Sequence, residues 1–322
     1  MTETPQPQQR PRRWRPALYL AITVALVLLG AAVVARLSLT ARPAAAEDTV
    51  FGPPTGAVPA GPGACAPPNP LTLHHLRDLA DWPAAAPTAL AAPTQPARDQ
   101  LRDIAAGITT GLCDGPGRYA YVQLRQWALD SHASGGRTEL TPAVTQYEHW
   151  LADNGSGRSI AVTTRTPATD NPPSDDSFPP GTSPATPDPA ATDPTQATTC
   201  LARNTAAGGP RAALTALADL NQWQTPTPPS RAALLRALAD TNGLTYQGTV
   251  VDRAGRTGVA VSATSDNSVE RELLIIDPAS GHLLAHEQAA LRDPGALGIS
   301  KPAVVSYTLF VARGHTDTVQ QR

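Results

Sequence analysis

The sequence predicts an α+β fold, in which a curved antiparallel sheet of about eight strands is covered on one face by amphipathic helices and preceded by one transmembrane helix. Three observations lead to this prediction. An uncharged apolar run lies near the N-terminus, several segments carry apolar residues at helical spacing, and others alternate apolar with polar residues. Turn-like connections between the strands are short, so neighbouring strands should be antiparallel and the helices must cover one face.

The apolar run comprises residues 17–35, which are 19 uncharged residues rich in Leu, Val and Ala. At about 1.5 Å per residue this run spans roughly 29 Å, close to the hydrocarbon thickness of a bilayer. Residues 1–16 form a basic tail with four arginines, which should keep the N-terminus in the cytoplasm. We therefore expect a single-pass protein of the cell membrane whose C-terminal domain is extracytoplasmic.

A cleavable signal peptide is the alternative to this anchor. Ala44, Ala45 and Ala46 offer the small residues of a cleavage site, so the chain could be cut after Ala46. Secretory apolar regions usually have about 7–15 residues, and this run is longer and separated from the alanines by Arg36 and Arg42. The sequence favours the anchor and leaves cleavage open.

The rest of the chain divides by composition. Residues 36–70 are rich in Pro, Gly and Ala, which is typical of an extended stalk. Residues 71–322 should form the extracytoplasmic α+β domain. Within it, residues 166–199 contain Pro, Thr, Asp and Ser with few apolar residues, and we expect a disordered insert that cannot offset its ordering entropy.

Helices are expected where apolar residues recur every three or four positions. Ser230 is the expected N-cap of the last of them, and Gly243 its stop. All of them should be amphipathic, with one buried stripe each. The expected helices are 71–80, 97–108, 210–223 and 230–240, and three of the expected stripes are Leu101, Ile104 and Ile108; Leu214, Leu217 and Leu220; and Leu234, Leu235 and Leu238.

Strands are expected where the period changes to two. Glycine pairs and Asx-rich clusters between them predict tight turns. The expected strands form two meanders, separated by the insert and two of the helices. They are 118–129, 146–152, 158–164, 244–252, 257–264, 270–276, 282–288 and 303–313.

Charge argues against nucleic acid as a partner. The net charge is −2; the first 46 positions hold six arginines against one glutamate, a net +5, so the rest of the chain carries −7 and is acidic. Lys301 is the only lysine, and no basic stripe is visible. Nucleic-acid binding depends on neutralising phosphates, which such a body does poorly.

Five aromatic residues of the first meander are the candidate ligand-lining residues. They could line a cavity, although aromatic pairs across strands are also an ordinary means of stabilising a sheet, and the second interpretation is favoured. These residues are Tyr119, Tyr121, Trp127, Tyr147 and Trp150.

No pattern indicates metal binding, a cofactor or catalysis. His282 and His286 lie four apart in an expected strand, about 13 Å from each other at 3.3 Å per residue, so they should not share a metal and are expected to be surface residues. His74 and His75 should lie on different faces of a helix. No nucleophile-elbow, dinucleotide-binding or Walker motif is present, and we expect a protein without enzyme activity.

The three cysteines suit an oxidising compartment, but their odd number leaves one without an intramolecular partner. Cys113 should end a helix before the first strand, and Cys200 should begin the structured part after the insert. We favour a Cys113–Cys200 disulfide, which would close the base of the insert. Cys65 would then have no partner within the chain.

Four segments resemble an uncharacterised family of membrane-anchored extracytoplasmic proteins of high-GC Gram-positive bacteria, often linked to extracytoplasmic-function sigma factors. The order of elements also looks like the half-barrel of lipoprotein carriers and of the regulator of an anti-sigma factor. The 16-residue tail departs from anti-sigma proteins, which need a cytoplasmic domain to bind a sigma factor. The segments that carry the resemblance are 117–123, 232–238, 248–256 and 274–278.

These observations together predict a non-enzymatic, membrane-anchored extracytoplasmic binding or sensing module. Its ligand would be lipid-like or a peptide, and its partners would be the membrane through residues 17–35 and possible envelope proteins. A structural envelope protein that contacts the cell wall or a partner protein is the alternative, and a hydrolase stands third.

Overall fold

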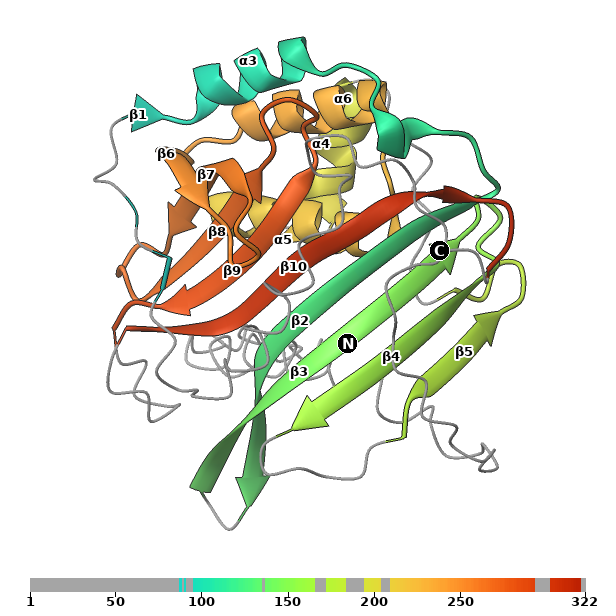
Figure 1. Cartoon of the computed structure of the whole chain (residues 1–322). Coiled ribbons are helices and arrows are strands. Elements are labelled where there is room, and N and C mark those ends of the chain that lie inside the picture. Colours follow the sequence, from blue (N-terminus) through green and yellow to red (C-terminus); the bar gives the residue numbers. More distant parts are fainter. Residues whose placement is uncertain are drawn as a thin grey trace, which may run out of the picture. The chain divides into compact units, whose positions relative to one another are not determined.

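The structure of the chain is a computed structural model (Figure 1). It describes residues 87–88, 90, 95–134, 137–165, 172–183, 194–203, 209–292 and 302–319, all of which belong to one compact unit, residues 52–322. The expected tail, membrane span and stalk, as well as the expected helix 71–80 with His74 and His75, lie outside the described residues. None of the described helices has both the length and the apolar character that crossing a membrane requires.

One open antiparallel sheet of ten strands organises the described chain (Figure 1). The two meanders join through β10, the C-terminal strand, which pairs with β2, the first long strand. The sheet order is β1-β6-β7-β8-β9-β10-β2-β3-β4-β5. The strands are β1 (Gln95–Pro96), β2 (Tyr119–Ser134), β3 (Arg137–Leu151), β4 (Gly157–Arg165), β5 (Ser174–Phe178), β6 (Thr245–Val251), β7 (Thr257–Thr264), β8 (Glu270–Ile276), β9 (Leu283–Ala290) and β10 (Ala303–Thr316).

The α+β class and the large antiparallel sheet are confirmed, the expected transmembrane helix stays a prediction, and the expected count of about eight strands is too low. Strand β1 is only two residues long and pairs with β6, so it leaves no periodic signal. Strand β5 lies inside the expected disordered insert 166–199, and so does the start of a helix, α4 (Pro194–Arg203). The expected disorder is therefore wrong for these residues. Hydrogen bonds to β4 hold β5 in place although its own side chains bury little surface.

The four α-helices of the described residues lie on one side of the sheet, in two layers. Helix α5 (Gly209–Trp223) packs directly on the strands of both meanders, and α3 (Arg98–Gly107) and α4 both pack on α6 (Pro228–Ala239). Helix α6 is consequently buried almost all round, with only Pro229, Arg236 and the cap residues exposed, rather than amphipathic as expected. A short 3₁₀ turn, η3 (Leu112–Asp114), precedes β2.

The N-cap of α6 is Thr227 rather than the expected Ser230. The Thr227 side chain accepts a hydrogen bond from the backbone N–H of Ser230, three residues on, as N-cap side chains commonly do. Pro228 then occupies the first helical position, where its missing N–H costs nothing. The sequence Thr-Pro-Pro-Ser contains both the Thr N-cap and the following Pro. The prediction instead took the serine, three residues after the threonine, as the N-cap.

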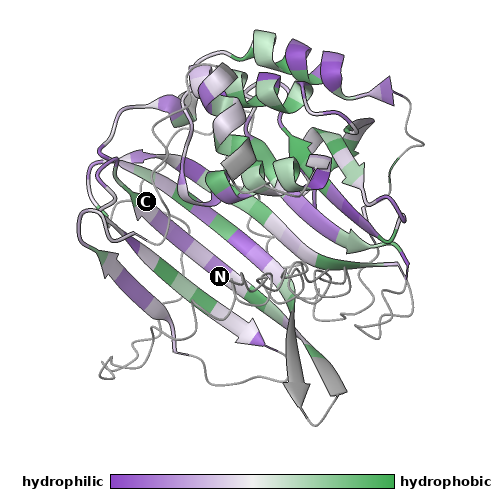
Figure 2. Ribbon diagram, turned by 180° about the vertical axis from the view of Figure 1, so that it is seen from behind, coloured by the Kyte–Doolittle hydropathy of each residue, from purple (hydrophilic) through white to green (hydrophobic). Residues whose placement is uncertain are grey.

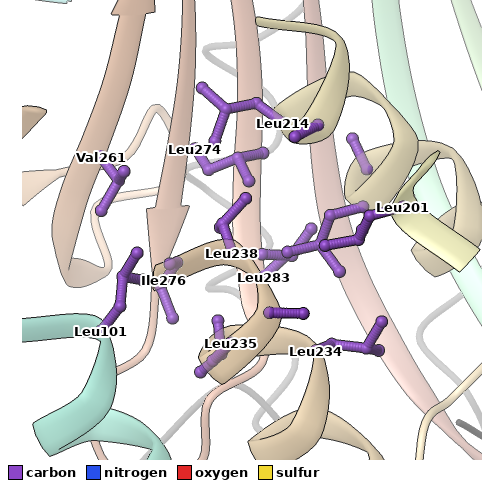
Figure 3. Close-up of a cluster of buried hydrophobic side chains, with 14 of the residues drawn as sticks. Leu101, Leu201, Leu214, Leu234, Leu235, Leu238, Val261, Leu274, Ile276 and Leu283 are labelled. Atoms are coloured by element: carbon purple, nitrogen blue, oxygen red, sulfur yellow. The ribbon is translucent and has the colours of Figure 1, made fainter. Parts of the chain in front are cut away.

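The expected stripes form the core between helices and sheet. Leu101, Leu214, Leu235 and Leu238 are fully or almost fully buried there, and they meet sheet residues such as Leu274 (Figure 3). We call this side of the sheet the helix face and the opposite side the back face. The strands alternate apolar and polar residues along their length, as the view from the helix side shows (Figure 2).

At Gly157 of β4, an added side chain would meet the backbone of β3. A Cβ atom built there would lie 2.0 Å from the carbonyl oxygen of Trp150, a backbone atom that cannot move away without breaking the ladder. We expect Gly157→Ala to lower the free energy of unfolding by about 3 kcal/mol. Gly314→Ala is the control, because nothing lies within 4 Å of its added Cβ, and we expect a change within about 1 kcal/mol. Equal costs in urea unfolding would contradict this account.

Candidate functional site

The five aromatic residues proposed from the sequence do not line one cavity. Tyr121 and Trp150 contact each other on the back face, with ring centroids 5.2 Å apart, and Trp127 belongs to the back-face apolar cluster. Tyr119 lies on the same side of β2 and is half-buried, whereas Tyr147 packs against the core of the helix face. The expected set is thus divided between the two faces, because alternate residues of a strand point to opposite sides.

A different aromatic group forms at the C-terminal end of α5. His149 of β3 stacks on Trp223 of α5 with ring centroids 3.8 Å apart, and Tyr147 stacks on the same imidazole at 5.4 Å. Phe178 of β5 meets the Trp223 ring edge-on. Burial lowers the pKa of His149 to about 3, so the ring is neutral in the folded protein. Sequence reasoning missed this group because three separated segments contribute to it.

Five polar side chains form a continuous line across the helix face, which we call the polar row. The strand pairs place these residues directly opposite one another in β9, β10, β2, β3 and β4. Four strand spacings of about 4.8 Å give the row a length of roughly 19 Å. Its members are His286, Thr308, Gln126, Thr145 and Thr163.

Hydrogen bonding in the polar row is incomplete. Thr145 and Thr163 share a hydrogen bond of 2.9 Å between their hydroxyl oxygens. The Thr308 hydroxyl and the Gln126 amide, in contrast, donate to and accept from no other described side chain, although Thr308 is only 1 % exposed. The Thr308 hydroxyl and the Gln126 amide can each donate and accept, so these two groups of the row are available to hydrogen-bond with a ligand that reaches them.

Charged side chains of the helix face converge at the β9 end of the polar row. The Nε2 atom of His286 lies 2.7 Å from a carboxylate oxygen of Glu272 on β8, and Gln288 donates to the other oxygen at 3.1 Å. Arg211 at the start of α5 lies 3.7 Å from Glu272 and forms a 2.7 Å ion pair with Glu270. His286 is buried by this arrangement and is not the surface residue that the sequence suggested.

A second polar cluster lies between α5, α6 and the β8–β9 turn. Arg313 of β10 donates to Asn221, to the Leu283 carbonyl at 2.6 Å, and to Nδ1 of His282 at 3.3 Å. Burial, and then the charges of Arg313 and Arg231, lower the pKa of His282. His282 is therefore also buried rather than on the surface, and it serves to hold β10 to the turn.

The same cluster includes the bidentate ion pair between Arg231 of α6 and Asp114 of η3, with contacts of 2.6 and 3.1 Å. Arg231 also donates to the carbonyl oxygens of Pro226 and Ser280. A recess beside these groups, lined also by Leu217, Leu234 and Gly281, has room for about one water molecule. Because its side chains already make many hydrogen bonds to one another and to the backbone, we assign this cluster a structural role.

The expected Cys113–Cys200 disulfide is wrong. Cys200 is a buried thiol in α4, where it packs with Ala197 and Leu201 in the core of the helix face. Cys113, in η3, is disulfide-bonded. The helix that carries Cys200 was not expected, and its apolar stripe turns the sulfur into the core rather than toward η3.

The fold and site define a class of protein: an α+β domain with one open ten-stranded antiparallel sheet, helices on one face, and a polar row beside them. Comparison with protein-family models, with curated proteins and with solved structures finds no match to this chain.

Proposed function

We propose that this chain is a non-enzymatic, membrane-anchored extracytoplasmic binding module, and that its ligand is an extended peptide held along the polar row. The incompletely satisfied row is the observation that carries the proposal. Hydroxyl and amide side chains both donate and accept, so they can match the alternating N–H and C=O groups of an extended backbone. Residues 17–35 would tether the module to the membrane, in line with the resemblance to membrane-anchored envelope proteins.

A lipid tail is disfavoured as the ligand because the apolar volume between helices and sheet is already filled. Leucines of α5 and α6 interdigitate with Leu274, Ile276 and Leu283 of the sheet (Figure 3). The recess between α5 and α6 has room for about one water molecule, far less than an acyl chain needs.

A hydrolase is the rival function that one observation favours. Glu272 orients His286 as a carboxylate orients a general base, and Thr308 lies directly opposite on β10. A nucleophile and its base need to be within about 3 Å of each other. No hydrogen bond joins the Thr308 hydroxyl to His286 among the contacts of the described chain, so binding without turnover is the better-supported function.

The test uses the full-length chain in lipid nanodiscs. Twelve-residue peptides selected from a random displayed library are synthesised and titrated by fluorescence anisotropy. Gln126→Ala/Thr308→Val removes two hydrogen-bonding groups; the Thr308→Val change keeps the side-chain shape, and the Gln126→Ala change also shortens the side chain. We expect binding to weaken about 5- to 100-fold, since each hydrogen bond contributes roughly 0.5–1.5 kcal/mol. Thr264→Val, at an exposed position in β7, is the matched control and should bind like the parent.

The other outcomes each point to another function. Peptide cleavage detected by mass spectrometry and abolished by His286→Ala would replace the binding module with a hydrolase. Uptake of a fluorescent phospholipid without any peptide selection would restore the lipid ligand. Failure of both probes would favour the structural envelope protein.

A further inference from the structure

A charged group on the back face is separate from the polar row and from the cluster around Arg231. Glu287 of β9 is 1 % exposed, and its carboxylate is paired with Arg271 of β8 at 2.9 Å and with Arg253 of the β6–β7 turn at 3.3 Å. The Arg253 guanidinium also lies over the ring of Tyr307, 4.7 Å from its centroid, on the strand next to β9. We call Glu287, Arg271 and Arg253 the Glu287 group.

The Glu287 group binds Thr88, a residue of the chain that precedes β1. The backbone N–H of Thr88 donates to Glu287 at 3.0 Å, and its hydroxyl donates to the same carboxylate at 2.6 Å. The carbonyl oxygen of Thr88 accepts a hydrogen bond from Arg271 at 3.1 Å. All three polar groups of one residue are therefore matched, and the hydroxyl contact makes the site specific for threonine or serine.

The chain around Thr88 is attached to the sheet at two separate places. On the back face, Thr88 binds the Glu287 group and Leu90 packs against the apolar cluster. At the edge of the sheet, β1 pairs with β6 through only two residues, Gln95 and Pro96. Strands β7 and β8 lie between β6 and β9 in the sheet order, so these two attachments are well apart.

Release of Thr88 would leave no buried charge without a counter-ion. Glu287 keeps both of its arginines, and Thr88 is only half-buried, so water can replace the hydrogen bonds that it loses. Opening the centre of the sheet would instead expose residues such as Leu273 and Ile275, which are 0 % exposed. Segments with few buried apolar contacts open at a lower free energy than core strands, so Thr88 can detach before the sheet unfolds.

We propose that Thr88 and the Glu287 group form a latch, which holds the start of the domain on the back face and opens while the sheet stays folded. When the latch is open, β1 is the remaining attachment. The seven residue steps from Thr88 to Gln95 then add up to about 24 Å to the reach of the chain that precedes the sheet. This effect on reach rests on the proposed membrane anchor, whereas the latch itself is independent of the anchor and of the peptide ligand.

The latch is tested by amide hydrogen exchange, read at single residues by mass spectrometry, on the full-length chain in nanodiscs. The Thr88 amide should be protected, but its protection factor should be at least about 100-fold lower than those of Leu273 and Ile275. Thr88→Val keeps the side-chain shape and the backbone N–H but removes the hydroxyl. We expect the protection factor at residue 88 to fall about 10-fold, with those of Leu273 and Ile275 unchanged.

Thr88→Ser is the matched control, because it keeps the hydroxyl and should retain most of the protection. An unprotected Thr88 amide in the parent protein would refute the latch, since the contact would then not form. Protection equal to that of Leu273 and Ile275 would refute it as well, because the segment would then open only with the whole domain. These two measurements need no variant to fold. Equal protection in Thr88→Val and Thr88→Ser would show that the hydroxyl holds nothing, which also contradicts the proposal.

Discussion

Replacing Asp114 with alanine should lower the free energy of unfolding by about 3–5 kcal/mol, because it leaves the Arg231 guanidinium buried without its counter-ion. The two side chains are only 2 % and 3 % exposed, so water cannot take the place of the carboxylate. Asp114 also accepts a hydrogen bond from the backbone N–H of Gly111, which the substitution removes. Urea unfolding of the full-length chain in detergent, followed by tryptophan fluorescence, measures the effect.

The matched control is Asp240→Ala. Asp240 forms an ion pair of the same type with Arg102 at 2.7 Å, but these side chains are 60 % and 50 % exposed. Exposed pairs contribute about 0–1 kcal/mol, since water screens them and replaces the lost contact. The two aspartates should therefore differ by at least about 2 kcal/mol. If both substitutions have the same small effect, the cluster around Arg231 does not hold α6 to η3.

Acid should destabilise the protein between about pH 6.5 and pH 3, and His149 should account for much of the loss. Burial lowers the pKa of His149 to about 3, whereas the same residue in the unfolded chain titrates near 6.5. Below pH 6.5 the unfolded chain therefore binds a proton that the folded protein does not. The contribution of the neutral ring is fully present above pH 6.5 and falls by about 2 kcal/mol at pH 5.

His149→Phe isolates this effect, because phenylalanine can still stack between Tyr147 and Trp223 but does not titrate. The difference in unfolding free energy between pH 7 and pH 5 should be smaller in this variant by about 2 kcal/mol. His282 is shifted in the same direction, so some acid sensitivity should remain. Tyr147→Phe keeps the imidazole and should retain the full dependence; a parent-like curve for His149→Phe would show that His149 is not the titrating group.

The spacing of apolar residues in the sequence correctly predicted the strands and helices that bury only one side. Strands β7 (Thr257–Thr264) and β8 (Glu270–Ile276) have the bounds expected from the sequence. The leucine stripes of α3 and α5 are in the core as expected, because an amphipathic pattern records which side faces away from water. The pattern failed at α6, where neighbours on all sides bury even Ser230 and Arg231.

Such local patterns could not predict the candidate site. The polar row exists only because β10 pairs with β2, which brings Thr308 opposite Gln126 although 182 positions separate them. A shift of one residue in that pairing would put Thr308 and His286 on the opposite face from Gln126, Thr145 and Thr163, and so break the row. Likewise, nothing local to His286 or Glu272 shows that they meet on adjacent strands.

By itself, the sequence determined the α+β class, the positions of most strands and helices, and the apolar stripes of the core, since each follows from neighbours within a few residues. Only the tertiary structure decided the pairing of the two meanders, the division of the aromatic residues between faces, the burial of His149, His282 and His286, and the thiol state of Cys200. Those features depend on contacts between segments far apart in the chain. Their free energies arise from long-range packing and hydrogen bonding, which local periodicity does not record.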